Sequence, residues 1–429
     1  MTAITPDRTP LLERASGAAA VRRYVPALVL LVLGFASLAA FGWGSAADAT
    51  TAFSLGRSGD YWMIPTFSLP SRVTAVVLSL VAMAVACYTA FAAWAGHKLG
   101  WWVPTVYAAT IILALLTWAG AGKNVTVQLT ALMLGAVTLS VPLVFGSLAG
   151  ALCERSGVIN IAIEGQLLFG AFMGAVLASA TGSPYVGLIA APIAGALVGA
   201  LLALFAVKYW VNQIVVGVVL NVLVVGITNF LYGTLLSDNP QLNRAIGLPD
   251  LPIPGLSGIP IIGPVLFNHN LFVYLMYAAV VVLHIMLFRS RWGLRLRAVG
   301  EHPKAADTVG IKVNRTRVRS TILGGAVAGL GGAFFTVSAG LAFSKEVTSG
   351  KGFIALAALI LGRWSPKGAL AAALLFGFAE ALKDQMGIMG SGIPSQFLAM
   401  LPYLATLCAV AGLVGHVRPP AAEGTPYKK

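Results

Sequence analysis

Carboxylates within long apolar stretches are the residues of this 429-residue chain best suited to chemistry. Glu164 lies between the apolar residues 161–163 and 167–169. A carboxylate at lipid depth costs roughly 3 kcal/mol or more unless it is paired or hydrated. Asn160 stands four residues earlier, on the same face if both belong to one helix, and Gln166 follows. These side chains either line an aqueous path or gate, or form a structural pin bonded to backbone.

Other polar side chains inside apolar runs have plainer interpretations. Glu380 can line a path, reach the membrane interface, or pair with Lys383 one helical turn later. Asn221 and Asn229 are eight residues apart, roughly one helical face, and form interhelical hydrogen bonds or contact substrate. We interpret His284, alone in its apolar run, as an interior histidine satisfied by its neighbours.

The apolar run 353–361 is too short to cross a bilayer, which takes about 20 residues. Hydroxyl and aromatic side chains surround it and the end of the preceding run: Ser338, Phe343, Ser344, Thr348 and Phe353. Interrupted helices beside such side chains often frame a small polar substrate near mid-membrane. We therefore expect part of a substrate path here.

Residues 289–319 form the most basic segment, with nine Lys and Arg residues opposed only by Glu301 and Asp307. Within it, the spacing predicts a short helix over 302–310, because Pro303 suits a first helical position and Gly310 suits a stop. The segment is either a solvated charged loop or a docking element.

Composition places the chain in the membrane, because 58% of its residues are hydrophobic and 10% are charged, against about 25% charged in soluble proteins. The net charge of +14 sits mainly in loops on one side, which favours membrane orientation over nucleic-acid binding. The three cysteines lack paired spacing, which argues against a disulfide framework or zinc site. Residues 349–352 lack the partner glycine and hydroxyl of a nucleotide-binding loop. We expect no metal or cofactor bound by this chain.

The apolar runs predict an all-α polytopic membrane bundle of about 12 spans, within a range of 10–12. The positive-inside rule places the basic segment and both termini in the cytoplasm. The predicted spans are 25–41, 73–95, 102–119, 129–152, 158–180, 185–207, 214–236, 271–288, 321–343, a broken span at 353–361, 369–382 and 397–415. We divide the chain into a cytoplasmic segment 1–24, extra N-terminal spans 25–125, a core 126–415 with a cytoplasmic loop 289–320, and a cytoplasmic tail 416–429.

Three stretches resemble the branched-chain amino acid/ribose/nucleoside class of ABC permeases. Residues 154–166 read ERSGVINIAIEGQ and resemble a signature of that class, and residues 298–311 read AVGEHPKAADTVGI and resemble its ATPase-docking loop. Residues 350–364, GKGFIALAALILGRW, resemble the nucleoside branch, which is linked to basic membrane lipoproteins. The resemblance covers roughly residues 130–415, so the spans before residue 125 depart from it.

The resemblance implies a type II-like importer permease in the bacterial plasma membrane, surrounded by lipid and itself no enzyme. It would carry nucleosides by alternating access, with a second related permease, a surface substrate-binding lipoprotein, and an ATPase subunit that uses the ATP. The implied ATPase-coupling residues are Glu301, His302, Pro303, Lys304, Ala305, Ala306, Asp307, Val309 and Gly310. On this basis, Ala306→Arg should leave folding intact but abolish uptake.

Other functions fit parts of the same pattern. The same machinery could carry ribose-like sugars or branched-chain amino acids, since aromatic side chains near a polar site suit either a base or a sugar. An ion- or proton-coupled secondary transporter would need Glu164 and Glu380 to meet. A membrane scaffold without transport is a third class.

Overall fold

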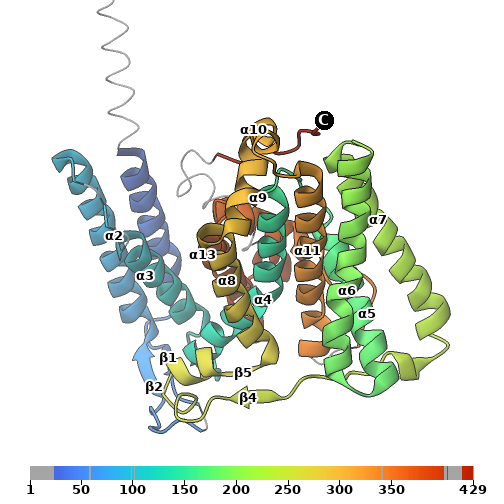
Figure 1. The fold of residues 1–429 in the computed structure, drawn as a ribbon. Helices are drawn as coiled ribbons and strands as arrows, with labels where there is room; N and C mark the ends of the chain where they lie inside the picture. The colour runs from blue at the N-terminus through green and yellow to red at the C-terminus, as the bar shows by residue number, and fades with distance from the viewer. Residues whose placement is uncertain are drawn as a thin grey trace, which may run out of the picture. The chain divides into compact units, whose positions relative to one another are not determined.

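The computed structural model describes residues 24–57, 59–97, 99–100, 102–339, 342–400, 403 and 418–428. In this part of the chain, nine helices are long and apolar enough to cross a membrane (Figure 1). They are Tyr24–Gly42, Ser71–Ala95, Trp102–Ala119, Leu129–Glu154, Ile163–Thr181, Pro184–Lys208, Gln213–Leu236, Leu271–Arg289 and Val313–Ser338. The chain is therefore a multi-pass, mostly helical membrane protein.

The first nine predicted spans each coincide with one of these helices, but three boundaries are wrong, among them the end of the ninth span, which lies at Ser338 rather than at residue 343. Helix α5 begins at Ile163 rather than at residue 158, because the preceding residues form an irregular linker. Helix α11 begins at Val313 rather than at residue 321, because the helix continues past its apolar run into the basic segment. The predicted span 397–415 lies almost wholly outside the described residues.

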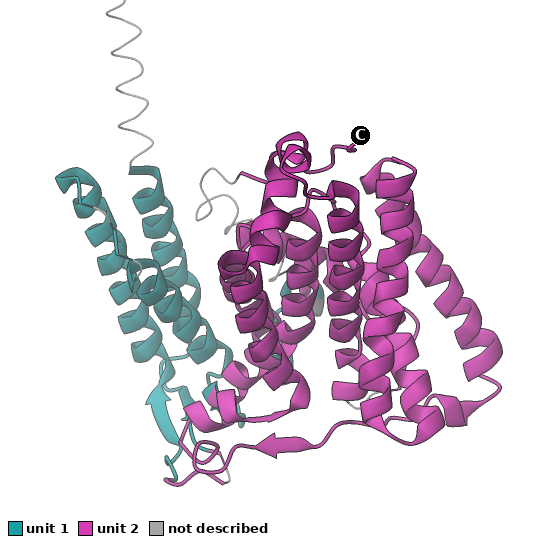
Figure 2. Cartoon of the chain, in the orientation of Figure 1, with its two compact units in different colours: residues 1–56, 63–129, 384–398 teal, residues 57–62, 130–383, 399–429 magenta. Residues whose placement is uncertain are grey.

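The chain divides into two compact units (Figure 2). Unit 1 takes the described residues of Met1–Gly56, Met63–Leu129 and Asp384–Leu398, and unit 2 takes those of Arg57–Trp62, Thr130–Lys383 and Ala399–Lys429. Each unit has its own core, with Ala82, Ala86 and Tyr107 in the first and a larger cluster in the second.

Unit 1 joins apolar helices to a small sheet. Helix α2 (Ser71–Ala95) packs on α3 (Trp102–Ala119), and the helix before them ends in the π-helical turn η1 (Leu38–Gly42). Strand β1 (Thr50–Ser54) pairs antiparallel with β2 (Phe67–Pro70) and parallel with β3 (Val127–Gln128). The buried Thr51 hydroxyl donates to the Thr117 carbonyl at 2.7 Å, so a side chain of the sheet supplies a hydrogen bond to the backbone of α3.

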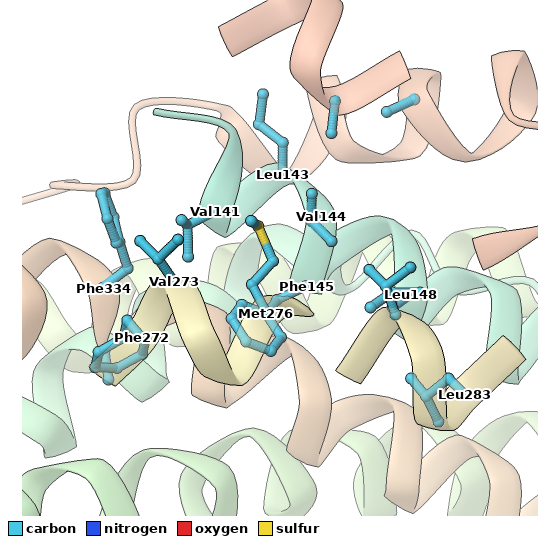
Figure 3. Close-up of a cluster of buried hydrophobic side chains, with 14 of the residues drawn as sticks. Val141, Leu143, Val144, Phe145, Leu148, Phe272, Val273, Met276, Leu283 and Phe334 are labelled. Carbon is cyan, nitrogen blue, oxygen red and sulfur yellow. The ribbon is translucent and has the colours of Figure 1, made fainter. Parts of the chain in front are cut away.

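Unit 2 is a helical bundle whose core lies between α4 (Leu129–Glu154), α8 (Leu271–Arg289) and the end of α11. Figure 3 shows Phe145, Leu148, Phe272, Met276 and Phe334 in this core. The other long helices are α5 (Ile163–Thr181), α6 (Pro184–Ala203), α7 (Gln213–Leu231), α11 (Val313–Gly332) and α13 (Pro366–Ile388). Helices α6, α7 and α11 lead into the π-helical turns η2 (Leu204–Lys208), η3 (Tyr232–Leu236) and η6 (Phe334–Ser338).

The loops at the two ends of unit 2 differ in structure. One end carries α9 (Arg291–Glu301) and α10 (Pro303–Thr308), and we call it the α10 end. The other carries residues 237–270, with η4 (Pro240–Leu242), η5 (Gly263–Phe267) and strands β4 (Asp250–Pro252) and β5 (Asn268–Asn270), which pair antiparallel. Two further elements are α12 (Lys351–Leu361) and α14 (Ser395–Ala399).

Glycines bring α6 and α11 into direct backbone contact, because small residues let two helix backbones approach closely. A Cβ on Gly325 would lie 2.4 Å from the Gly195 carbonyl oxygen, and one on Gly329 would lie 2.3 Å from that of Ala191. These approaches leave no room for a side chain, so the glycine run serves helix packing.

We expect Gly329→Val to destabilise the protein by about 1–3 kcal/mol or more, because overpacking forces backbone shifts. The melting temperature of the purified protein should fall. Gly226→Val is the matched control, since nothing lies within 4 Å of a Cβ there. Equal melting temperatures for the two variants would contradict the close α6–α11 contact.

Candidate functional site

Glu164 binds the first turn of α12. Its carboxylate accepts hydrogen bonds from the Thr348 hydroxyl at 2.6 Å and from the backbone N–H groups of Gly350 and Gly352 at 2.9 and 2.6 Å. A negative charge at a helix N-terminus complements the helix dipole and satisfies N–H groups that lack intrahelical partners. The contacts favour the structural pin over a free gate residue.

The C-terminal end of α12 is held by Glu154 and Arg155, at the junction of α4 and the linker that follows it. The Arg155 guanidinium donates to the carbonyls of Trp364 at 3.0 Å and Arg363 at 3.2 Å. The Trp364 indole N–H donates to the Glu154 carboxylate. Glu164 at the start of α5 and Arg155 in the linker 155–162 therefore bracket α12, with an anion at its N-terminus and a cation at its C-terminus.

Asn160 and Gln166 bond to each other rather than to a solute path. Asn160 Nδ2 donates to Gln166 Oε1 at 3.0 Å, and Gln166 Nε2 donates back to Asn160 Oδ1 at 3.3 Å. Asn160 precedes α5, so the expectation that it shares a helical face with Glu164 is wrong. The chain turns here through Gly157, whose φ of +92° suits glycine.

Asn221 joins α7 to the start of α5. Its Oδ1 accepts from the Gly165 N–H at 2.8 Å, and its Nδ2 donates to the Ile161 carbonyl at 2.9 Å. These bonds favour the interhelical alternative. Asn229 Oδ1 and His284 Nδ1 are buried without a hydrogen-bond partner in the described part of the chain, so His284 is not satisfied at that atom.

Ser338 and Phe343 tie the end of α11 to the loop 237–270. Asn270 Nδ2 donates to the Ser338 hydroxyl at 2.8 Å. Asn243 accepts from the Phe343 N–H at 2.7 Å and donates to its carbonyl at 2.9 Å. The Phe343 ring is 1% exposed and meets Phe172 edge-on at 5.1 Å, so it packs inside the unit.

Glu380 forms an ion-pair group with two lysines. It pairs with Lys351, the first residue of α12, and with Lys383 at 3.7 Å. The side chains of Lys351 and Glu380 are 15% and 14% exposed. Phe353, one residue beyond Gly352, is 52% exposed. Glu164 and Glu380 thus have separate partners on either side of the same helical turn, rather than meeting as an ion-coupled transporter requires.

The predicted docking helix is α10, which begins at Pro303 and is followed by Gly310 with φ +84°. Its exposed residues include Lys304, Ala305 and Val309, the last 75% exposed, while His302 and Gly310 flank it. Ala306 is 3% exposed and packs against Val299 and Val313. The expectation that Ala306→Arg leaves folding intact is therefore wrong, because an arginine would enter this apolar cluster.

Sequence reasoning missed Lys351, Thr348, Asn243 and Arg317 as partners. The signal for Lys351 is the Gly350-Lys351-Gly352 pattern, in which one cation lies between two glycines at the start of a short apolar run. The sequence does not single out Arg317 for a buried role, because it is one of nine basic residues in its segment. Within the described residues, no group of three or more His, Cys, Asp or Glu side chains could hold a metal ion.

The chain is similar to known transport proteins over most of its length. Residues 132–411 match the family described as branched-chain amino acid transport system / permease component. A guanosine ABC transporter permease protein of Bacillus subtilis, NupQ, is 38% identical over 307 residues, covering 67% of this chain and 93% of the relative. The nucleoside ABC transporter permease protein NupC of Lactococcus lactis is 36% identical, covering 71% and 99%. A putative glucose ABC transporter permease protein of Haloferax volcanii, TsgC13, is 32% identical, covering 62% and 78%. No solved structure matches significantly.

Proposed function

This chain belongs to the branched-chain amino acid transport system permease family, and from this premise we propose that it forms the membrane path of an ATP-driven nucleoside importer. As an ABC permease of the cell membrane, it is a non-catalytic subunit that works with an ATPase and a binding protein. We propose that its immediate partners are a second related permease and a surface lipoprotein. The ATP is used by the ATPase subunit.

The nucleoside assignment rests on the similarity to NupQ, a guanosine permease that is 38% identical to this chain over 93% of its own length. NupC, named for nucleosides, supports the same class at 36% identity. A sugar is the second candidate, because the putative glucose permease TsgC13 is 32% identical over 78% of its length.

We place the substrate path along residues 344–353. Irregular backbone at membrane depth persists only where protein buries it or where it lines a wet cavity. Ser344 and Ser349 are exposed in this irregular stretch, and Phe353 follows on α12. The exposed Phe353 ring offers a stacking surface to a nucleoside, and the Lys351–Glu380 pair on the same helical turn offers polar partners.

Buried polar residues hold the segments that form this path in place. Glu164 holds its turn, Ser338 and Phe343 hold the chain before it, and Asn160, Gln166 and Asn221 hold the start of α5. Glu380 positions Lys351. In this proposal, only Phe353 and the ion-pair group face the solute directly.

We further propose that the α10 end is cytoplasmic, together with both termini, and that the ATPase docks on the exposed face of α10. Nucleotide binding would draw two ATPase subunits together and move α10, which is followed at once by α11. Such a movement shifts a two-state bundle between inward and outward access. Residues 25–125 precede the family match and would form an added membrane unit of unassigned role.

Uptake competition in cells tests the substrate class. Cells with the complete transporter should accumulate labelled guanosine, and cells lacking only this chain should not. Excess unlabelled nucleosides should suppress the uptake, whereas ribose, glucose and leucine should not. Suppression by a sugar but not by nucleosides would replace the nucleoside assignment with the sugar alternative.

A further inference from the structure

The C-terminal segment 418–428 lies along the α10 end of unit 2, where Figure 1 shows the chain terminus beside α10. Its backbone bonds to two other segments. The Ala422 N–H donates to the Gly300 carbonyl at 2.8 Å, and the Gly424 N–H donates to the Gly157 carbonyl at 3.2 Å. The segment thus joins the end of α9 to the α4–α5 linker.

The Arg317 side chain is buried and bonds to this segment. Its guanidinium donates to the Thr425 carbonyl at 2.7 Å, the Ala422 carbonyl at 3.5 Å and the Ser156 carbonyl at 3.1 Å. Only 1% of Arg317 is exposed. Two of these three acceptors belong to the C-terminal segment, so its removal would leave a buried cation short of partners.

Tyr427 extends the contact to α10 itself. Its ring packs on the apolar cluster that contains Ala306 and Val313, and its hydroxyl hydrogen-bonds to the Asp307 carboxylate. The next residue, Lys428, places its ammonium 4.9 Å from the centre of the Trp210 ring in the turn between α6 and α7. The segment therefore contacts the α4–α5 linker, the end of α9, α10 and the turn between α6 and α7.

We propose that residues 418–428 form a coupling strap that makes α10 and the α4–α5 linker move as one body. The linker holds the C-terminal end of α12 through Arg155, and it leads directly into α5, where Glu164 holds the N-terminal end. The strap therefore completes a continuous path of contacts from the ATPase-docking helix to the wall of the solute path. This inference rests on the proposed function and adds a positioning role for Arg317 and Tyr427.

The strap carries a pH-sensitive contact, since the Glu423 carboxyl lies against that of Glu154, which also receives the Trp364 indole N–H. Burial raises the pKa of Glu423 above its ordinary value of 4.5. Protonation therefore favours the attached strap, and attachment weakens as pH rises from 4.5 through the raised pKa of Glu423. Amide exchange in the strap, corrected for intrinsic rates, should become faster as pH rises from 4.5 through that range. Glu423→Gln should show a smaller difference, and an equal difference would contradict this contact.

The decisive test compares three variants with the intact transporter in vesicles, measuring solute moved per ATP hydrolysed. Truncation after residue 417 should lower this ratio about tenfold while the complex still assembles and hydrolyses ATP. Tyr427→Ala should lower it in the same direction, and Tyr427→Phe, which keeps the ring contact with α10, should restore most of it.

A purely structural strap would reduce the amount of complex but leave the ratio unchanged, and that result in Tyr427→Ala would overturn the proposal. Raised uptake after truncation would overturn it too, because it would mark the strap as inhibitory. Failure of the intact transporter to couple uptake to ATP would instead contradict the proposed function.

Discussion

Glu164→Ala is expected to reduce uptake by far more than tenfold and to lower the melting temperature of the assembled transporter. The substitution removes the acceptor for three donors, the Thr348 hydroxyl and the N–H groups of Gly350 and Gly352. Leaving buried donors unsatisfied costs about 1–3 kcal/mol each, so the total is on the order of 4 kcal/mol. The first turn of α12 would then detach from α5.

Two milder variants calibrate that result. Thr348→Val removes one bond and should cost about 1 kcal/mol. In Glu164→Gln, the amide oxygen can still serve Thr348 and Gly350, but its NH2 group would face the Gly352 N–H, so an intermediate loss is expected. Wild-type uptake and melting temperature in Glu164→Ala would show that the pin contributes nothing to the path.

Val309→Arg is expected to abolish uptake while expression, folding and binding of the lipoprotein stay normal. Val309 is 75% exposed and directly follows α10, so in the proposed docking it would meet the ATPase without supporting the fold. A charged side chain at the centre of a docking surface costs about 2 kcal/mol or more, or roughly 30-fold in affinity. Co-purification of the ATPase with the permease measures the loss.

The neighbouring positions supply the controls for this variant. Val309→Ala keeps an apolar surface and should retain most of the uptake. Ala306→Arg should lose expression together with uptake, since Ala306 is buried against Val299 and Val313. Full co-purification of the ATPase with Val309→Arg would contradict docking of the ATPase on α10.

Much of this arrangement can be predicted from composition and spacing. Long apolar runs identify the first nine spans because a helix must satisfy its backbone internally within lipid. Pro303 and Gly310 identify α10 because their backbone preferences are local. The glycines of α11 indicate close helix packing, because only small residues permit it, but they do not identify α6 as the partner helix.

The remaining features depend on contacts between residues far apart in the sequence. The start of α11 at Val313 is invisible to an apolar pattern, since the helix leaves the apolar run while remaining packed. The irregular linker before α5 depends on Asn160 finding Gln166 and on Arg155 finding α12. The strap depends on Arg317 acquiring carbonyls more than a hundred residues away. No local propensity encodes these partners.

In the proposed function, an external ATPase drives solute through this chain. This can be measured as guanosine uptake into sealed vesicles holding both permease subunits, with the binding lipoprotein added and ATP supplied on the ATPase side. Uptake should require the ATPase and ATP together and should persist when the proton gradient is collapsed. Equal uptake by vesicles that lack the ATPase would show that the ATPase does not drive transport.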